Sequence, residues 1–320
     1  MTPTSNPALE PDALYAKSQV YIRRGLRAQA HKEQEEYQLW ASLSLELLGK
    51  AALAKVHPAL VADPMHFQSL FAACGRQLSP DIKSINAKTL FERLSHLEKA
   101  FDSRHQKFCE QMAIKRNAEL HSGESPFSGI LSDNWEQEFW VTIETILSMQ
   151  DQTIESWLGV EDSKAPAKII AKASQAIEWI VKRRVENCNA SFQKRKKDPQ
   201  LHPATSGVPK KVRWSDYNMD TGSNCNCPAC GSKGVLNGSL WSEKIVSSTP
   251  GWNNPNDMED VYIDPPLETV EKYYVAEEFH CTECGLSLYG TKEITAAGMP
   301  EEYTITEDRV MEFGEEYGND

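Results

Sequence analysis

The chain has 320 residues, of which 40% are hydrophobic and 25% are charged, as in soluble globular proteins and unlike disordered or fibrous ones. Its length favours two domains. No apolar run reaches the roughly 18–20 residues that cross a bilayer, and the N-terminus lacks the basic and apolar segments of a signal peptide, so we expect a cytoplasmic protein with no membrane partner.

The net charge of −12 is unevenly distributed along the chain. Residues 1–180 carry 19 basic and 23 acidic groups, residues 181–213 carry 10 and 2, and residues 214–320 carry 5 and 21. A basic segment therefore lies between two acidic ones. It could bind a polyanion, or it could pack against the acidic part of its own chain.

Residues 1–198 are predicted to form an all-helical domain, because apolar residues recur every three or four positions and turn signals are few. The expected helices span 14–54, interrupted once, and 66–74, 87–97, 99–121, 134–158 and 165–197. Within the first, Glu46 and Lys50 are spaced to form an ion pair, which we expect to be exposed to solvent, although Glu46 could support a site.

The character of the sequence changes after residue 198. Residues 199–222 form a basic and polar linker containing Pro, Ser and Gly, and residues 223–320 are acidic and rich in β-branched and aromatic residues. Short strands are expected within 233–248, 259–263, 270–280, 286–294 and 302–311. The predicted fold is therefore mainly α: a helical bundle followed by a small β-rich domain.

Two cysteine motifs occur in the β-rich domain, CPACG at 227–231 and CTECG at 281–285. Two C-x-x-C turns supply four thiolates, a closed tetrahedral set typical of structural Zn²⁺ bound by Cys227, Cys230, Cys281 and Cys284. A redox-active C-x-x-C is the competing interpretation, but it requires one motif at a helix start. The domain resembles a zinc ribbon. Because it is acidic, we expect it to bind a regulatory protein partner rather than nucleic acid.

The segment KRNAELHSGE, residues 115–124, closes the helix predicted over 99–121. One interpretation is purely structural, because basic side chains are favoured at a helix C-terminus and Gly123 can end the helix. The other is a ribonuclease site. Arg116, Asn117 and His121 resemble the Arg-(four to six residues)-His motif of the HEPN superfamily, in which a polar residue often follows the arginine.

The HEPN resemblance covers residues 30–160 and implies a metal-independent endoribonuclease with no catalytic cofactor. It implies that two chains form a dimer and share a cleft, with Arg116, Asn117 and His121 as catalytic residues and with 2′,3′-cyclic phosphate and 5′-hydroxyl products. Family members serve as toxins or antiphage effectors. Arg24 with His31 and Arg195 with His202 also fit the bare pattern, but neither pair has the polar partner and the helix end.

Two further predictions concern partners. The basic run is a candidate contact for the RNA substrate, through Lys182, Arg183, Arg184, Lys194, Arg195, Lys196 and Lys197, although such a run is usually a solvated helix face.

The alternative function is a non-catalytic HEPN-like scaffold for dimerisation or nucleotide binding, with the zinc ribbon as an adaptor. In that case Arg116 and His121 matter only for stability.

Overall fold

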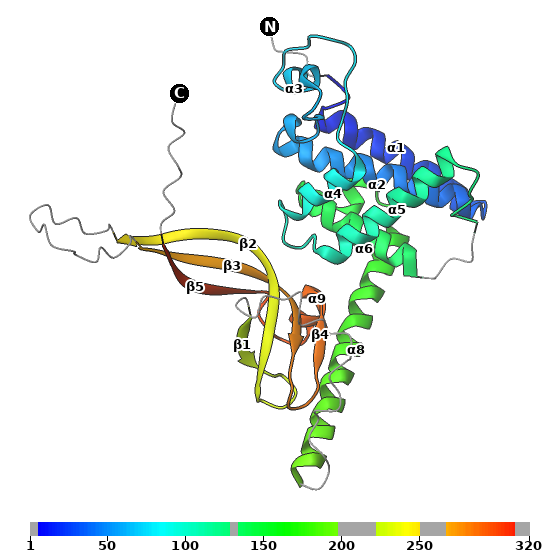
Figure 1. Cartoon of the computed structure of the whole chain (residues 1–320). Helices are drawn as coiled ribbons and strands as arrows, with labels where there is room; N and C mark the ends of the chain where they lie inside the picture. Colours follow the sequence, from blue (N-terminus) through cyan, green and yellow to red (C-terminus); the bar gives the residue numbers. More distant parts are fainter. Residues whose placement is uncertain (1–5, 129–133, 198–221, 250–266, 311–320) are drawn as a thin grey trace, which may run out of the picture. The chain divides into compact units, whose positions relative to one another are not determined.

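The structure is a computed structural model that describes residues 6–128, 134–197, 222–249 and 267–310 (Figure 1). Contacts within the chain divide it into two compact units, residues 1–176 and residues 177–320. The division falls inside one long helix, whereas the predicted helical domain ends at residue 198. All of the predicted linker except Gly222 lies outside the described residues, as does the strand expected within 259–263.

The first unit is built from helices. Its elements are α1 (Pro11–Ala30), α2 (Gln34–Val56), the short 3₁₀ helix η1 (Pro58–Leu60), α3 (Phe67–Ala73), α4 (Ala87–Ser95), α5 (Ser103–His121), α6 (Asn134–Ser148), α7 (Ile154–Leu158) and the first part of α8 (Lys164–Lys197). The helical prediction is confirmed in outline. None of the described helices is both long enough and apolar enough to cross a membrane.

Local signals account for the helix ends. The interruption expected within 14–54 lies between α1 and α2, where Lys32 has a φ of 65°. Asn86 and Asp102 begin α4 and α5 by accepting hydrogen bonds from backbone N–H groups of the first turn. The helix expected over 134–158 is divided into α6 and α7, since Asp151 has a φ of 56° and Thr153 starts α7 with a capping box.

The core of the first unit surrounds α2, which packs along α1 and contacts α4, α5 and α6. Leu45, Leu48 and Leu53 of α2 are buried, and Trp140 of α6 and Trp157 of α7 are the largest fully buried side chains. Gly49 permits a close approach of α4, because a Cβ there would lie 3.1 Å from Leu94. The bundle therefore holds α5 against α2, which positions the end of α5.

The second unit combines the C-terminal half of α8 with an antiparallel sheet (Figure 1). The strands are β1 (Ser223–Asn226), β2 (Lys233–Thr249), β3 (Leu267–His280), β4 (Ser287–Tyr289) and β5 (Glu302–Val310), with α9 (Thr291–Ala296) between the last two. Their order is β1-β2-β3-β4, and β5 also pairs with β3. A helical part and a small β-rich part are thus confirmed, and the short strand expected within 286–294 is β4, which ends at Tyr289. Gly290, with a φ of 76°, precedes α9 there.

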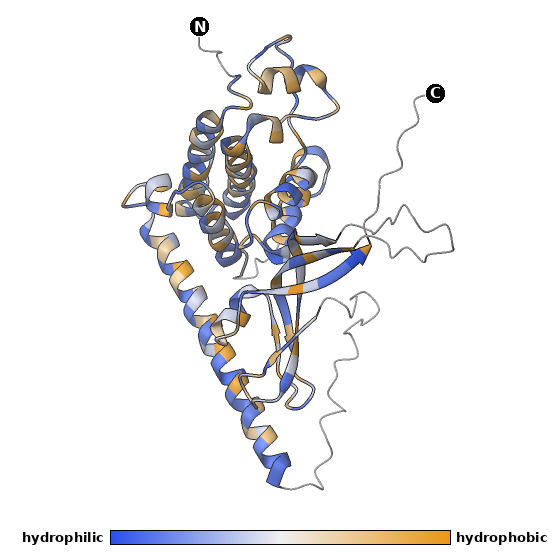
Figure 2. Ribbon diagram, turned by 90° about the vertical axis from the view of Figure 1, so that its left-hand side faces the viewer, coloured by the Kyte–Doolittle hydropathy of each residue, from blue (hydrophilic) through white to orange (hydrophobic). Residues whose placement is uncertain are grey.

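One face of α8 contributes to the core of the second unit. Val181 is fully buried, and Ile177, Val185, Cys188 and Phe192 pack against the same cluster as Leu236 and Phe279 of the sheet. These α8 residues recur at helical spacing, and hydrophobic and hydrophilic residues alternate along the helix in Figure 2. Gly234 lets β2 approach Phe279, whose ring a Cβ would meet at 2.5 Å.

Candidate functional site

The end of α5 is joined to α2 by a cluster of charged side chains. Glu46 of α2 accepts a hydrogen bond from Lys50 through Oε1 at 2.7 Å, and it forms an ion pair with Arg116 of α5 through Oε2. Lys50 also donates to Ser84 Oγ at 3.0 Å. The side chains of Lys50, Glu46 and Arg116 are only 11%, 16% and 12% exposed. Two cations therefore share one carboxylate in a largely desolvated place.

The prediction that Glu46 and Lys50 form a solvent-exposed ion pair is wrong. The pair faces α5 and the segment before α4 rather than water. Burial by itself would raise the pKa of the Glu46 carboxyl, but Lys50 and Arg116 together hold that pKa below its usual value. The motif at residues 115–124 includes Arg116 but not Glu46. The contact between Glu46 and Arg116 could not be predicted from the motif, because it depends on how α2 packs against α5.

Asn117 is fixed by the residue that precedes it. The Arg116 guanidinium donates to Asn117 Oδ1 from Nε at 3.1 Å and from Nη2 at 2.8 Å. The amide oxygen therefore already accepts two hydrogen bonds, so the amide NH₂ of Asn117 is the group that remains to donate to a ligand. The Glu46 carboxylate, the Arg116 guanidinium and the Asn117 amide form one connected chain.

His121 ends α5 on an exposed surface. It lies one turn after Asn117, so both side chains project from the same side of the helix, and both are exposed. The side chain of His121 makes no hydrogen bond to any residue within the described ranges. Ile114 and Leu120, at the same end of α5, are 68% and 49% exposed. The structure thus places all three predicted residues together, with Arg116 partly buried and Asn117 and His121 exposed.

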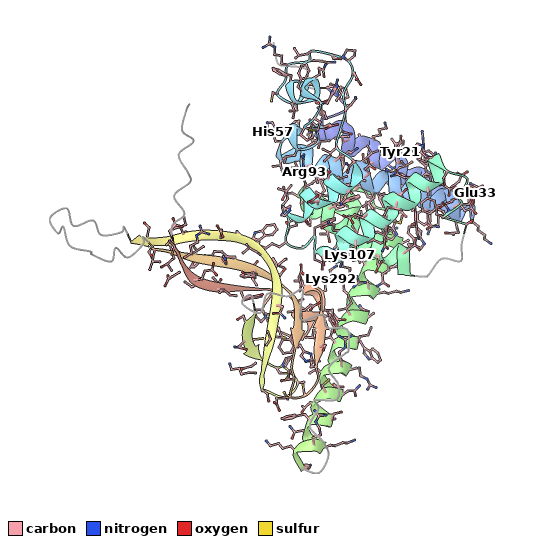
Figure 3. All side chains as sticks on the ribbon, in the orientation of Figure 1. Tyr21, Glu33, His57, Arg93, Lys107 and Lys292 are labelled. Atoms are coloured by element: carbon pink, nitrogen blue, oxygen red, sulfur yellow. The ribbon has the colours of Figure 1, made fainter. Side chains whose placement is uncertain are left out.

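The two other Arg-to-His matches differ from this arrangement. Arg24 of α1 stacks on Trp40 at 4.9 Å and on Tyr21, labelled in Figure 3, at 5.6 Å, so its guanidinium serves helix packing. His31 is the exposed residue that follows α1. Arg195 donates to the Glu283 carbonyl at 2.9 Å, and His202 lies outside the described residues.

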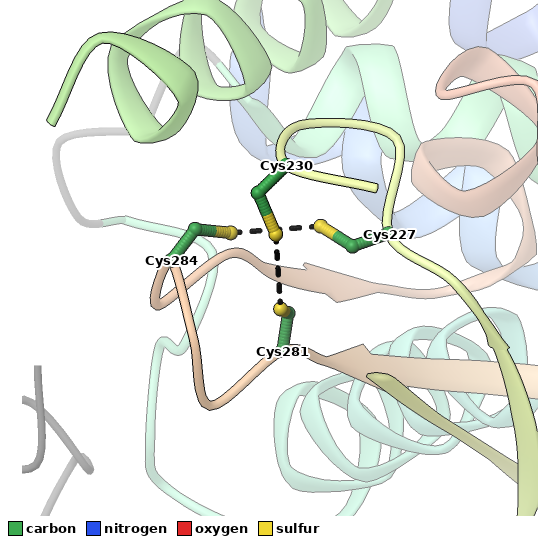
Figure 4. A group of neighbouring side chains, drawn as sticks. All are labelled: Cys227, Cys230, Cys281 and Cys284. Carbon is green, nitrogen blue, oxygen red and sulfur yellow. Dashed lines mark hydrogen bonds between the residues drawn. The ribbon is translucent and has the colours of Figure 1, made fainter. Parts of the chain in front are cut away.

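A second candidate site is a group of four cysteines in the second unit. The sulfur atoms of Cys227, Cys230, Cys281 and Cys284 lie within 4.8 Å of one another and face a common point (Figure 4). The Cys227–Cys284 and Cys230–Cys281 sulfur distances are 3.5 and 3.6 Å. The predicted ligand set is therefore brought together, in a place that can hold a metal ion.

Both cysteine turns have the same backbone geometry. The N–H of Gly231 donates to the Cys227 carbonyl at 2.9 Å, and the N–H of Gly285 donates to the Cys281 carbonyl at 2.8 Å. The two glycines have φ values of 75° and 77°, a conformation that residues with a Cβ rarely adopt. Each C-x-x-C-G segment is thus a preformed turn that directs two sulfurs to one side.

Two neighbouring groups, Cys225 and His280, do not belong to the cluster of four. Cys225 lies on β1 and is partly buried, and burial raises the pKa of its thiol. The Nδ1 atom of His280 lies 2.9 Å from Ser287 Oγ, which accounts for the orientation of the ring. The four clustered cysteines therefore form the candidate metal site without either neighbour.

The basic run on α8 has several different surroundings. Arg184 forms an ion pair with Glu293 at 2.6 Å and donates to the Ser287 carbonyl at 3.0 Å, and Arg195 contacts the Glu283 carbonyl. Lys182 lines a groove of about 540 Å³ together with Glu178 and Glu186. The exposed remainder comprises Arg183, Lys194, Lys196 and Lys197. Part of the predicted RNA contact therefore faces the sheet instead.

Comparison with known proteins finds no matching family model, no similar curated protein and no similar solved structure.

Proposed function

We propose that the chain is a metal-independent endoribonuclease of HEPN type whose catalytic residues are Arg116, Asn117 and His121. The observation that carries this proposal is the end of α5. There an exposed imidazole and an exposed amide lie on one side of a helix, and a buried ion pair fixes the amide.

The chemistry of RNA cleavage suits these groups. RNA carries its own nucleophile, the 2′-hydroxyl, so cleavage requires a base for that hydroxyl, an acid for the leaving 5′-oxygen and donors for the phosphate oxygens. Imidazole can accept or donate a proton near neutral pH. In this proposal His121 transfers the proton, and the Asn117 NH₂ donates to a phosphate oxygen. The products are a 2′,3′-cyclic phosphate and a 5′-hydroxyl.

Arg116 has a narrower role here than the family motif implies. Its guanidinium is largely shielded from solvent and shares Glu46 with Lys50, so two positive charges face one negative charge. The cluster keeps a net positive charge near the phosphate, while the guanidinium orients Asn117 through two hydrogen bonds. Glu46 is then a positioning residue that acts through Arg116.

One imidazole cannot be base and acid at the same time, so the proposal includes a homodimer in which two copies of His121 share a cleft. Ile114 and Leu120 are exposed apolar side chains at the same end of α5. Apolar residues beside an exposed polar site favour burial against another surface. A second copy of this helix end would cover them and would bring the two histidines together.

A non-catalytic scaffold is the second candidate function, and the ion pair itself favours it. Arg116 is held by Glu46 and Asn117, as a residue that only joins α5 to α2 would be. In that case Arg116 and His121 matter only for stability, and replacing the exposed His121 changes no RNA cleavage. The two candidates therefore differ most in what they predict for His121.

The metal in the second unit is proposed to be structural Zn²⁺. A tetrahedral Zn²⁺ with bonds of about 2.3 Å places its sulfurs about 3.8 Å apart, close to the sulfur distances of 3.5 and 3.6 Å. Four cysteines leave no open position, so the metal would stabilise the fold rather than assist cleavage. Reduced thiols also suit a cytoplasmic setting.

The biological setting that we propose is a toxin or antiphage effector. The zinc ribbon would then act as a sensor or as a docking element for a regulatory protein. The test of the enzymatic proposal is RNA cleavage by the full-length protein and by His121→Ala, each in metal-free buffer with unaltered oligomeric state. We expect cleavage to be lost in the variant, and equal cleavage by both proteins would overturn the proposal.

A further inference from the structure

The outward face of α8 in the second unit combines an exposed tryptophan with basic groups that form no ion pair with any carboxylate in the described part of the chain. Trp179 is 63% exposed, an unusual state for the residue with the largest apolar side chain. The Arg183 guanidinium lies 5.5 Å from its ring centroid. Because the cation covers one side of the indole, the other side of the ring is left for a flat ligand group.

Further cations lie on the same side of the helix. Lys194 and Lys197 follow Trp179 by 15 and 18 residues, which returns them to the side of α8 that carries Trp179 and Arg183. The side chains of Val181, Val185 and Cys188, on the opposite side of the helix, pack in the core that α8 shares with the sheet. The outward face, defined by Trp179, Arg183, Lys194 and Lys197, spans about 27 Å of helix.

Two carboxylates of this part of α8 line a groove at its side. Glu178 and Glu186 line this groove together with Lys182, Pro228 and Ala296. Glu186 also follows Trp179 by seven residues, so it lies at the edge of the outward face. Arg184 is paired with Glu293 on the sheet side. The outward face therefore carries three cations and one carboxylate, which leaves it with a net positive charge.

We propose that this outward face of α8 binds single-stranded RNA, with a base stacked on Trp179 and with phosphates near Arg183, Lys194 and Lys197. An aromatic ring that stacks a base and a row of cations that follows the backbone are the two features with which proteins hold single strands. A duplex presents no unstacked base, so it lacks the group that Trp179 recognises. The inference rests on the proposed function only for the choice of RNA over DNA.

The test is the binding of a fluorescent single-stranded RNA to full-length protein carrying His121→Ala, which removes the proposed cleavage. In that background, Trp179→Ala is expected to weaken binding about 10-fold, as for the loss of one stacked base. Replacing Lys194 and Lys197 together by Gln is expected to lower the slope of log affinity against log salt by about 1.4, since roughly 0.7 is lost per phosphate contact.

Two surface variants of the same unit serve as matched controls. Tyr289→Ala removes another half-exposed aromatic side chain, and Lys244→Gln removes an exposed lysine from β2. Both are expected to bind like the parent protein. Circular dichroism and light scattering on every variant check that fold and oligomeric state are unchanged.

The inference is overturned if Trp179→Ala binds as tightly as the parent, if duplex RNA binds as tightly as the single strand, or if polyglutamate competes as well as RNA. A change in oligomeric state with unchanged RNA binding would also overturn it, and would assign Trp179 to a protein contact. Because binding is measured without cleavage, a protein that binds through Trp179 but never cleaves RNA supports this inference and contradicts the ribonuclease.

Discussion

Glu46 connects the proposed catalytic residues to the interior of the helical unit. Its two oxygens accept hydrogen bonds from Lys50 and Arg116, so loss of the carboxylate leaves two cations facing each other with little exposure to water. Such uncompensated charges are costly even when they are partly solvated. Glu46 should therefore matter for stability and for the placement of Arg116 alike.

Glu46→Gln is expected to lower the free energy of unfolding by about 1–3 kcal/mol at pH 7. Because the pKa of Glu46 is lowered in the folded protein, its contribution is present above the ordinary glutamate pKa of about 4.3 and is lost as pH falls through the lowered value. Urea unfolding at pH 7 and at low pH measures this, with the exposed Glu92→Gln as the control. A difference from wild type that stays constant down to the lowest pH would contradict the assignment.

Asn117 offers a second test at the scale of one residue. Asn117→Asp keeps the Oδ1 atom that accepts from Arg116 but removes the NH₂ that is proposed to contact phosphate. We expect stability to change by less than about 0.5 kcal/mol, while RNA cleavage falls by about 10²-fold, as for the loss of one transition-state donor. Unchanged cleavage would show that the amide only fixes the helix end.

Helix α8 belongs to both units, and its second half is part of the core of the second unit. The helix itself was predicted from its sequence with nearly correct ends, because helical periodicity is local. Its division at residue 176 was not predicted, since a helix has the same pattern whichever unit its apolar face contacts. The spacing of Ile177, Val181 and Val185 was the available signal.

The cysteine turns, unlike the division of α8, could be predicted from the sequence. Their geometry is local: the spacing of the two cysteines and a glycine with positive φ determine each turn, so the ligand set could be predicted from residues alone. The contact of Arg116 with Glu46 joins residues 70 positions apart, and it could be known only once α2 and α5 were packed.

The packing of α8 predicts a strong effect at Val181. Val181→Asp places an unpaired charge in a fully buried position and is expected to destabilise the second unit by roughly 3 kcal/mol or more. The exposed Ala190→Asp on the same helix is the matched control and should be nearly neutral. Release of bound metal during urea unfolding reports on this unit, and equal midpoints for the two variants would contradict the shared core.

At the scale of the whole molecule, the metal is expected to stabilise the second unit and not the first. Removal of the metal leaves four thiols, three of them buried, without the ion that joins them. The sheet and the second half of α8 share one core, so both should be affected. The first unit has its own core around α2. Metal should therefore affect residues 177–197 and the strands together.

Hydrogen exchange with and without metal tests this directly. Stripping the metal is expected to remove protection from β2, β3 and residues 177–197 of α8, while α2 and α6 keep theirs. Cys281→Ser should have the same effect as stripping, and Cys225→Ser, which alters a cysteine outside the cluster, should have none. Protection of 177–197 that survives loss of the metal would contradict the coupling.

The division of the chain also determines where the chain can be cut to test what the second unit contributes to the proposed activity. A chain cut near residue 203 would keep the whole of α8 and would expose Val181 and its apolar neighbours. Any change in the activity of the shortened chain would then combine the effect of losing the sheet with the effect of damage to the helix. A cut after residue 176 follows the division between the two units.

The most direct test of the central claim is the chemistry of the RNA ends produced by full-length protein in buffer with a chelator, after the zinc content has been verified. His31→Ala is the control, because His31 is also exposed, also lies at the end of a helix and also follows an arginine at the spacing of the motif. Wild type and His31→Ala are expected to yield 2′,3′-cyclic phosphates at equal rates. His121→Ala is expected to yield none. Equal yields from all three proteins, or no cleavage by wild type as a verified dimer, would contradict a ribonuclease site at the end of α5.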